Sequence, residues 1–224
     1  MRFPTALAFL FLTAAATPVA ASQEDFQLWL PMTLNANFND SFRGYYEVQP
    51  RIGHDASEVT QLILRTALDW RFKPEWAASF GYAWTPTLAP AYTNENRVYE
   101  QLLYADDYAW GRLTSRTRFE QRWIEGVSGT ALRFRTMLRG QIPFTEDRLW
   151  SVAVQEEIFF NLNSPSGGPV AGFDQNRFFL GVNRRLSDYV SMDAGYQIQF
   201  VDTAEPGFPD RVNHVLLIQL FLQI

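Results

Sequence analysis

The amino-acid sequence predicts an all-β protein, an antiparallel up-and-down transmembrane β-barrel of 10–12 strands with a charged, arginine-rich lumen. Three observations support this prediction. Charged and apolar residues alternate along extended segments, the connections between segments alternate between short and long, and large aromatic residues stand near both ends of the segments. Outer-membrane barrels combine these features, because they have an apolar outer surface, a polar interior and aromatic girdles at both interfaces.

The clearest alternation lies in residues 112–125. Successive side chains of a strand point to opposite sides, so one face carries charges of both signs, those of Arg116, Arg118, Glu120 and Arg122. The opposite face carries Leu113, Thr117, Phe119 and Trp123. A strand of a soluble sandwich would turn its charged face to bulk water. The return of this pattern in later segments favours lipid outside and an ion-paired interior.

Eleven segments of the chain have a strand pattern. They are residues 26–36, 43–53, 59–71, 76–86, 97–105, 112–125, 131–142, 149–161, 174–186, 189–201 and 211–223. No helical period of comparable length competes with them. Bacterial single-chain barrels have an even number of strands. We therefore expect ten or twelve strands. The count of eleven segments then means that one boundary is misplaced or that the first segment is not an ordinary barrel strand.

The connections between these segments give a second signal. Short turns are expected at residues 72–75, 106–111, 145–148 and 186–188, and longer Pro- or Gly-rich loops at 87–96, 164–172 and 203–210. Outer-membrane barrels have short periplasmic turns and longer external loops. The aromatic residues expected at the two membrane interfaces are Trp70, Trp76, Trp84, Trp110, Trp123 and Trp150.

The first 21 residues predict a cleaved signal peptide. Arg2 supplies a positive n-region, residues 6–16 an apolar h-region, and Val19-Ala20-Ala21 a small-residue cleavage site. The h-region is too short to span a bilayer, and the rest of the chain has no run of about 18 apolar residues. We expect a signal peptide at residues 1–21, a barrel domain at residues 22–224, and location in the outer membrane of a Gram-negative envelope.

Composition excludes several classes of site. The 224-residue chain has no cysteine and a formal net charge of −5. The lack of cysteine excludes disulfides and cysteine-ligated metal sites. No basic tract suggests nucleic-acid binding. No phosphate loop, dinucleotide fingerprint, zinc-ligand spacing or EF-hand loop occurs, so we expect no cofactor and no metal.

Strand parity places a set of charged residues inside the barrel. This predicted lumen network consists of Glu47, Arg51, Arg65, Asp69, Arg97, Arg116, Arg118, Glu120, Arg122, Arg133, Arg135, Arg139, Glu157 and Arg177, together with Arg185 and Asp193. Eighteen of the 19 basic residues are arginine, whose rigid planar fork pairs with carboxylates through two hydrogen bonds. The favoured interpretation is a paired lattice that fills the lumen and holds strand register. The alternative is a narrow, porin-like pore or a site for small ions or anionic solutes.

The chain has two histidines, whose roles stay open. His54 lies in or beside a turn near Asp55 and Glu58, as a solvated turn residue would. His214 shares the outward face of the last segment with apolar residues. A histidine that faces lipid would suit an enzyme that attacks phospholipid. Such an enzyme needs a nucleophile and an orienting group within hydrogen-bond reach, and none is evident. We expect no enzyme, with a lipid-modifying outer-membrane hydrolase as one alternative and a periplasmic lipocalin-like binding barrel as another.

Several motifs resemble a family of bacterial outer-membrane barrels known as domain of unknown function 2490. They are Trp29, Gln49-Pro50-Arg51, Gly81-Tyr82, residues 94–97, Gln101, residues 116–122, residues 133–135, Glu157, residues 174–177, Gly195-Tyr196 and Asn213-His214. The Arg-x-Arg-x-Glu-Gln-Arg block at residues 116–122 is the most distinctive. The resemblance covers nearly all of the mature chain and implies an outer-membrane barrel without assigned chemistry. For such a barrel, the expected partners are outer-membrane lipids and the barrel assembly machinery.

Overall fold

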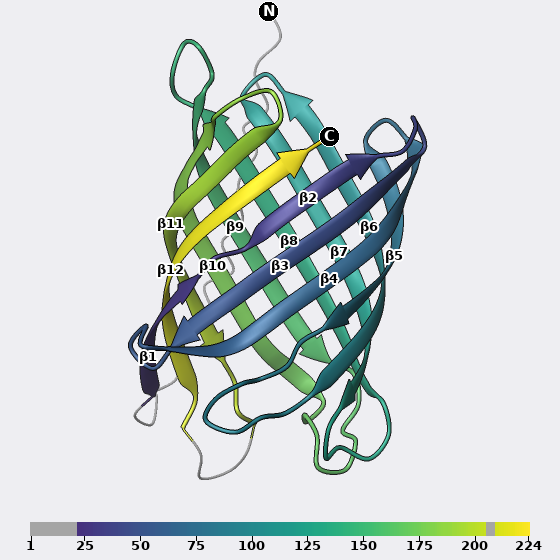
Figure 1. The fold of residues 1–224 in the computed structure, drawn as a ribbon, viewed down its shortest axis with the longest axis vertical. Coiled ribbons are helices and arrows are strands. Elements are labelled where there is room, and N and C mark those ends of the chain that lie inside the picture. Colours follow the sequence, from purple (N-terminus) through teal and green to yellow (C-terminus); the bar gives the residue numbers. More distant parts are fainter. Residues whose placement is uncertain (1–21, 205–208) are drawn as a thin grey trace, which may run out of the picture.

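The computed structural model describes residues 22–204 and 209–224, which form a closed β-barrel (Figure 1). The predicted signal peptide, residues 1–21, lies outside the described residues. No helix in the described part of the chain is long and apolar enough to cross a membrane. All eleven predicted segments form strands, and the first of them is divided in two. The all-β barrel predicted from the sequence is therefore confirmed.

Twelve strand segments follow one another along the chain. They are β1 (Gln23–Trp29), β2 (Met32–Asn37), β3 (Phe42–Gly53), β4 (Glu58–Lys73), β5 (Trp76–Trp84), β6 (Glu95–Tyr108), β7 (Gly111–Ile124), β8 (Ala131–Pro143), β9 (Trp150–Asn161), β10 (Gly172–Arg185), β11 (Val190–Val201) and β12 (Arg211–Gln223). From β2 onward each strand pairs antiparallel with the next one in the chain.

The barrel closes through a parallel pairing of its first and last strands. β12 pairs with β1 and then with β2, and both pairings are parallel. β1 and β2 are two halves of one wall strand, interrupted at Leu30 and Pro31, because proline has no N–H to donate to the ladder. The wall thus has eleven strands, within the predicted range of 10–12, but the expectation of an even number was wrong. With an odd number of alternating strands, the first and last run in the same direction and must pair in parallel.

The break between β1 and β2 remains hydrogen-bonded on both sides. The amide nitrogen of Leu30 donates to the carbonyl oxygen of Pro50 at 3.1 Å, and that of Leu220 donates to the carbonyl oxygen of Pro31 at 2.9 Å. In Figure 1, β12 lies beside β1 in its first half and beside β2 in its second. The barrel wall is therefore continuous through the interruption.

Strand parity sorts the side chains as the sequence alternation predicts. In β4, Leu68 and Trp70 are 49% and 52% exposed on the outer face, whereas Asp69 between them is 1% exposed. Most other strands likewise turn arginine, carboxylate or amide side chains inward and large apolar side chains outward, although a few apolar side chains such as Phe159 and Phe179 are buried among the charges. The described barrel therefore has a charged interior and an apolar exterior, the reverse of a soluble protein.

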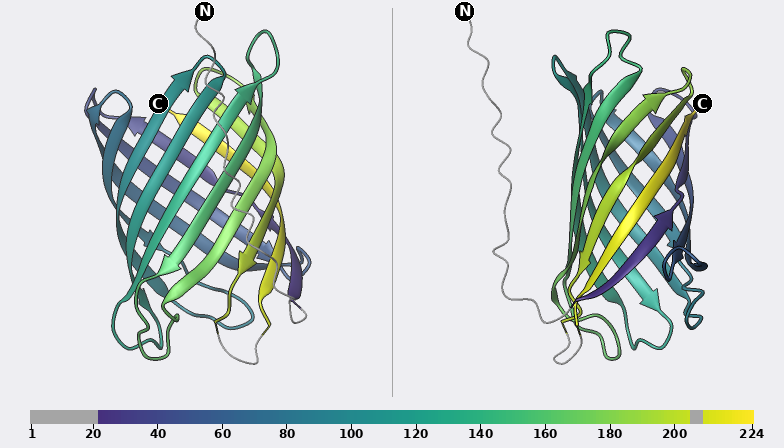
Figure 2. Two further views of the ribbon diagram at one scale, coloured as in Figure 1. Left: turned by 180° about the vertical axis from the view of Figure 1, so that it is seen from behind. Right: turned by 90° about the vertical axis from the view of Figure 1, so that its left-hand side faces the viewer.

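The two ends of the barrel differ in their connections, as Figure 2 shows. Residues 85–94, 125–130 and 162–171 form loops at the end where β1 begins, which we call the long-loop end; the shorter β3–β4 turn, residues 54–57, lies at the same end. Residues 38–41, 74–75, 109–110, 144–149 and 186–189 form the turns at the opposite end, which we call the short-turn end. The chain also terminates at the short-turn end, after β12.

Gly81 on the inner face of β5 accommodates a large neighbour. Tyr99 on β6 is fully buried, and its hydroxyl donates to the carbonyl oxygen of Thr66 at 3.3 Å. A Cβ at Gly81 would lie 2.3 Å from the Tyr99 ring and 2.7 Å from that carbonyl oxygen. The tyrosine ring therefore occupies the space that any larger residue at position 81 would need.

We predict that Gly81→Ala lowers the free energy of unfolding by about 1–3 kcal/mol, the usual cost of an added methyl group in a filled interior. Urea unfolding in detergent micelles, followed by tryptophan fluorescence, measures the change. Gly140→Ala is the matched control, because its Cβ would meet the nearest atom, in the Trp110 ring, at 3.9 Å. Equal stability of both variants and the parent would contradict the packing of Tyr99 over β5.

Candidate functional site: an arginine-lined lumen

A cavity of about 1420 Å³ occupies the lumen of the barrel. Its lining includes Gln23, Asp55 and Arg211 at the long-loop end and Asn35 and Gln223 at the short-turn end. The cavity therefore reaches both ends of the barrel. Its middle part is bordered by the charged side chains that the strand alternation directs inward.

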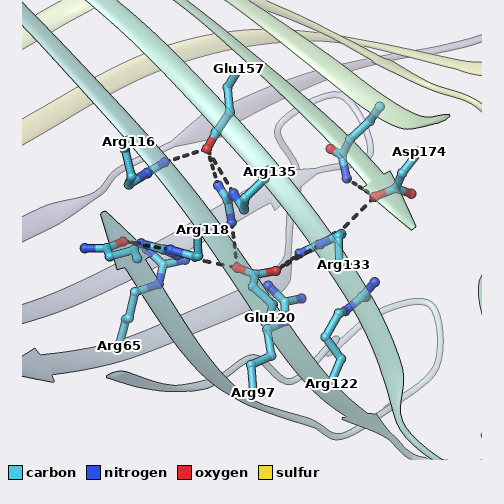
Figure 3. Close-up of polar contacts among 12 residues, drawn as sticks. Arg65, Arg97, Arg116, Arg118, Glu120, Arg122, Arg133, Arg135, Glu157 and Asp174 are labelled. Carbon is cyan, nitrogen blue, oxygen red and sulfur yellow. Dashed lines mark hydrogen bonds and ion pairs between the residues drawn. The ribbon is translucent and has the colours of Figure 1, made fainter. Parts of the chain in front are cut away.

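Two glutamates form the centre of the ion-pair network (Figure 3). Arg135 bridges them, donating to Glu120 Oε1 at 3.0 Å and to Glu157 Oε1 at 2.9 and 2.7 Å. Arg133 donates twice to Glu120 Oε2, at 2.9 and 2.7 Å, and Arg116 donates to Glu157 Oε1 at 2.5 Å. These residues come from β7, β8 and β9. The network therefore ties three neighbouring strands together.

A second group lies nearer the long-loop end. Glu95 on β6 accepts hydrogen bonds from Arg97 at 2.6 and 2.9 Å and from Arg122 at 2.6 and 3.3 Å. Arg133 also lies 3.2 Å from a carboxylate oxygen of Asp174 on β10. Sharing of the Glu95 carboxylate between two guanidinium groups offsets the large desolvation cost that a buried ion carries.

Three more carboxylates are paired around the wall. The pairs are Glu47–Arg65, Asp69–Arg43 and Asp193–Arg139. Neutral groups donate further hydrogen bonds to the same carboxylates, from Tyr45, Ser79 and Asn183 respectively. The Asp193–Arg139 pair joins β11 to β8, which are not neighbours in the sheet. Ion pairs therefore span the lumen as well as adjacent strands.

Arg118, which is 2% exposed, is held chiefly by neutral groups. Its Nε and Nη2 both donate to Gln101 Oε1, at 2.9 and 2.7 Å, and its guanidinium carbon lies 4.1 Å from the centre of the Tyr99 ring. The nearest carboxylate oxygen, on Glu120, is 3.5 Å from Nη1. An amide and an aromatic face here substitute for part of the charge pairing.

The described interior contains more arginines than carboxylates. Twelve arginines and seven aspartates or glutamates line the cavity. The buried side chains of Arg118, Glu120, Asp69 and Asp193 raise these numbers to thirteen and ten. The whole chain has the opposite balance, with a formal net charge of −5. Positive charge is therefore concentrated in the lumen.

Trp29 is a lumen residue that the charge pattern alone does not identify. It ends β1, is 2% exposed, and its Nε1 donates to Gln27 Oε1 at 2.8 Å. The guanidinium carbons of Arg51 and Arg177 lie 3.6 and 5.0 Å from the centre of its ring. Its parity with the inward residues Asp25 and Gln27 is the sequence signal that would have located it.

The fourteen residues of the predicted network from Glu47 to Arg177 all lie on the inner side of the wall. Asp193 lies there too. Arg185 is the exception and a correction. It is the last residue of β10, and its side chain, 56% exposed, pairs with Asp188 in the following turn at 2.8 Å. Strand parity does not predict the direction of this side chain, because it lies at the rim of the barrel, where water can solvate its charge.

The six tryptophans predicted at the interfaces lie at the ends of strands. Trp70, Trp76, Trp110 and Trp150 are at the short-turn end, and Trp84 and Trp123 at the long-loop end. Among them, Trp76 packs against Tyr104 with ring centres 4.9 Å apart, and Trp110 stacks on Tyr108 at 5.7 Å. Tryptophans therefore lie on both sides of the apolar band of the outer surface.

The histidines lie outside the lumen network. His54, in the β3–β4 turn, is 2.9 Å from Glu58, and both side chains are exposed. His214 on β12 accepts or donates a hydrogen bond with the Tyr196 hydroxyl and lies 3.7 Å from Glu24. Neither neighbour of His214 is a serine, threonine or cysteine nucleophile. Among the described residues, no group of three His, Cys, Asp or Glu side chains could hold a metal ion.

We predict that Glu120→Gln lowers the free energy of unfolding by about 3–5 kcal/mol, because it leaves Arg133 and Arg135 with less counter-charge in a buried site. Urea unfolding in micelles measures this change. Glu58→Gln, which alters an exposed carboxylate beside His54, is the control and should leave the unfolding midpoint unchanged. A Glu120→Gln protein as stable as the parent would contradict the structural importance of the network.

Comparisons with known proteins identify one family, and that family has no assigned activity. An uncharacterized protein of Methylorubrum extorquens is 32% identical over 228 residues, covering 98% of each chain. Among solved structures, the siderophore receptor PirA from Pseudomonas aeruginosa aligns with a TM-score of 0.34 and 11% identity, over 80% of this chain. This chain spans about a third (34%) of that receptor. The family described as "Protein of unknown function (DUF2490)" matches residues 26–210, and the chain belongs to that family.

Proposed function

We propose that this protein is an outer-membrane β-barrel whose lumen is a narrow, anion-selective passage. The outer surface supports the membrane part of the proposal. Leu68, Phe80, Leu180 and Tyr196 are each 47–60% exposed, in the middle of four different strands. Soluble monomers rarely expose a continuous apolar surface of this kind. Hydrocarbon around the barrel would cover it, with the tryptophans at both borders.

Connection lengths support one orientation in the membrane. Outer-membrane barrels keep short turns in the periplasm and longer loops outside. The short-turn end would therefore face the periplasm, together with the end of β12. In this orientation β1 begins at the outer surface, as the parallel closure with β12 requires.

The observation that carries the proposed activity is the charge of the lumen. An excess of arginine lines a cavity that reaches both ends of the barrel, in a chain that is acidic overall. Arginine stays protonated in proteins, so this excess attracts anions and repels cations. A lipocalin-like barrel would instead have an apolar interior for an apolar ligand.

The carboxylates give the lumen its selectivity without cancelling its charge. Three of them each fix two or more guanidinium groups, as Glu157 fixes Arg116 and Arg135. A fixed guanidinium loses little side-chain entropy when an anion arrives. The lumen is therefore a preorganised lining in which anions replace part of their hydration shell with N–H donors.

We predict that the purified protein in a planar lipid bilayer passes chloride in preference to potassium. A salt gradient across the bilayer gives the preference from the sign of the reversal potential. Preference for potassium would contradict the proposal. Absence of conductance from correctly folded protein would also contradict it, and would favour a lattice that only stabilises the barrel.

We predict further that Arg116→Gln lowers the chloride-to-potassium permeability ratio by about 25-fold. One charge at about 4 Å changes an ion's energy by about 1 kcal/mol in water, which is about fivefold for each ion and opposite in sign for chloride and potassium. Glu157 keeps its two hydrogen bonds from Arg135 in this variant, so the barrel should still fold. Arg185→Gln, at the exposed rim, is the matched control and should keep the parent ratio. An unchanged ratio in Arg116→Gln would oppose passage of ions along this wall.

A further inference from the structure

We infer that the lumen contains a discrete binding site for small hydroxylated oxyanions, such as sugar acids or sugar phosphates, between Arg51 and Arg177 beside Trp29. This inference rests on the proposed anion-selective lumen, because the ligand must enter along it. The two arginines come from β3 and β10 and contact the same indole ring, at 3.6 and 5.0 Å. Both line the cavity.

The two guanidinium groups have no close carboxylate partner, in contrast to arginines such as Arg122, Arg133 and Arg135. Among the described residues, no carboxylate lies within ion-pair distance of Arg51, whose Nη1 donates to Gln61 Oε1 at 2.9 Å. Arg177 has a single distant contact, 3.9 Å from Glu157, and its Nη2 donates to Gln175 Oε1 at 3.0 Å. Two like charges near one ring, held by neutral amides, destabilise each other unless an anion joins them.

Aromatic contacts orient these arginines for a ligand. The guanidinium carbon of Arg177 lies 4.6 Å from the centre of the Phe159 ring as well as 5.0 Å from that of Trp29. Rings that cover the faces of a guanidinium leave its N–H edge for hydrogen bonds. The buried Nε of Arg177 has no hydrogen-bond partner among the described residues. The N–H edge of a guanidinium matches the paired oxygens of a carboxylate or phosphate. A halide is a single atom and cannot pair with this edge through two acceptor atoms.

Neutral amides around the pair explain the preference for hydroxyl groups. Gln175 accepts from Gln199, which accepts from Asn213 at 3.0 Å, so a chain of amides continues from Arg177 toward β12. Gln197, on the same face of β11 as Gln199, is 3% exposed, and its Nε2 has no partner among the described residues. Amides both donate and accept, as sugar hydroxyl groups do. The unpartnered donor of Gln197 would bind one of these hydroxyl oxygens.

The test is calorimetric titration of the full protein in detergent micelles with four probes. Gluconate offers a carboxylate with hydroxyl groups, glucose 6-phosphate a phosphate with hydroxyl groups, inorganic phosphate an oxyanion alone, and glucose hydroxyl groups alone. We expect one or both sugar anions to bind at least about tenfold more tightly than glucose, which lacks the charge-assisted hydrogen bonds, and than inorganic phosphate, which lacks the hydrogen bonds of the sugar hydroxyl groups. Binding of only one sugar anion identifies carboxylate or phosphate as the recognised group.

Variants link the binding to this site. Arg51→Gln should weaken binding at least about tenfold, and Arg51→Lys, which keeps the charge but not the planar fork, should weaken it less. Arg51→Gln leaves no carboxylate unpaired, so folding should persist. Arg177→Gln is a second variant with the same expected loss, and Arg185→Gln is the control with parent affinity.

Three results would overturn the inference: no sugar anion binds better than glucose, inorganic phosphate binds as tightly as either sugar anion, or both glutamine variants keep the parent affinity. These outcomes are separate from the proposed passage. Chloride-selective conductance without binding of a sugar anion would overturn this site and leave the passage standing. Binding without any conductance would support the site and contradict the passage.

Discussion

Sharing of buried carboxylates between arginines is the interaction on which the whole barrel depends. A charge inside the barrel is stable only while its partner lies within hydrogen-bond distance, since an unpaired buried ion costs several kcal/mol. Each pair therefore specifies how two or more strands are aligned, as Glu120 aligns β7 with β8 through Arg133 and Arg135. A slip of one residue would turn these charges toward the apolar exterior.

The same network leaves a surplus of positive charge, and the surplus is not spread evenly. Three glutamates of the lumen each hold two or more guanidinium groups, whereas Arg51 and Arg177 are held mainly by amides and aromatic rings. Stability and ligand recognition therefore use different arginines of one lumen. The paired arginines maintain the wall, and the amide-bound ones are available to an anion.

Much of this architecture could be predicted from the sequence, because a period of two residues fixes both the strand and its faces. The alternation in residues 112–125, for example, indicates which side chains of that segment enter the lumen. The parallel closure could not be predicted, since pairing between β1 and β12 depends on strands at opposite ends of the chain and the usual even number argued against it. Trp29 was not assigned to the lumen because the predicted network was built from charged residues alone. The pairing of each arginine depends on side-chain reach across the lumen, which strand parity does not determine.

The most direct test of the account compares the surroundings of one outward-facing and one inward-facing position of the barrel wall. The chain has no cysteine, so single cysteines can be introduced at Leu180, on the outer face of β10, and at Gln155, which lines the cavity from β9. Spin labels there report collisions with membrane-dissolved oxygen or with a water-soluble nickel complex in lipid vesicles. The account predicts oxygen access at position 180 and nickel access at position 155. Nickel access at position 180, or the reverse pattern, would contradict it.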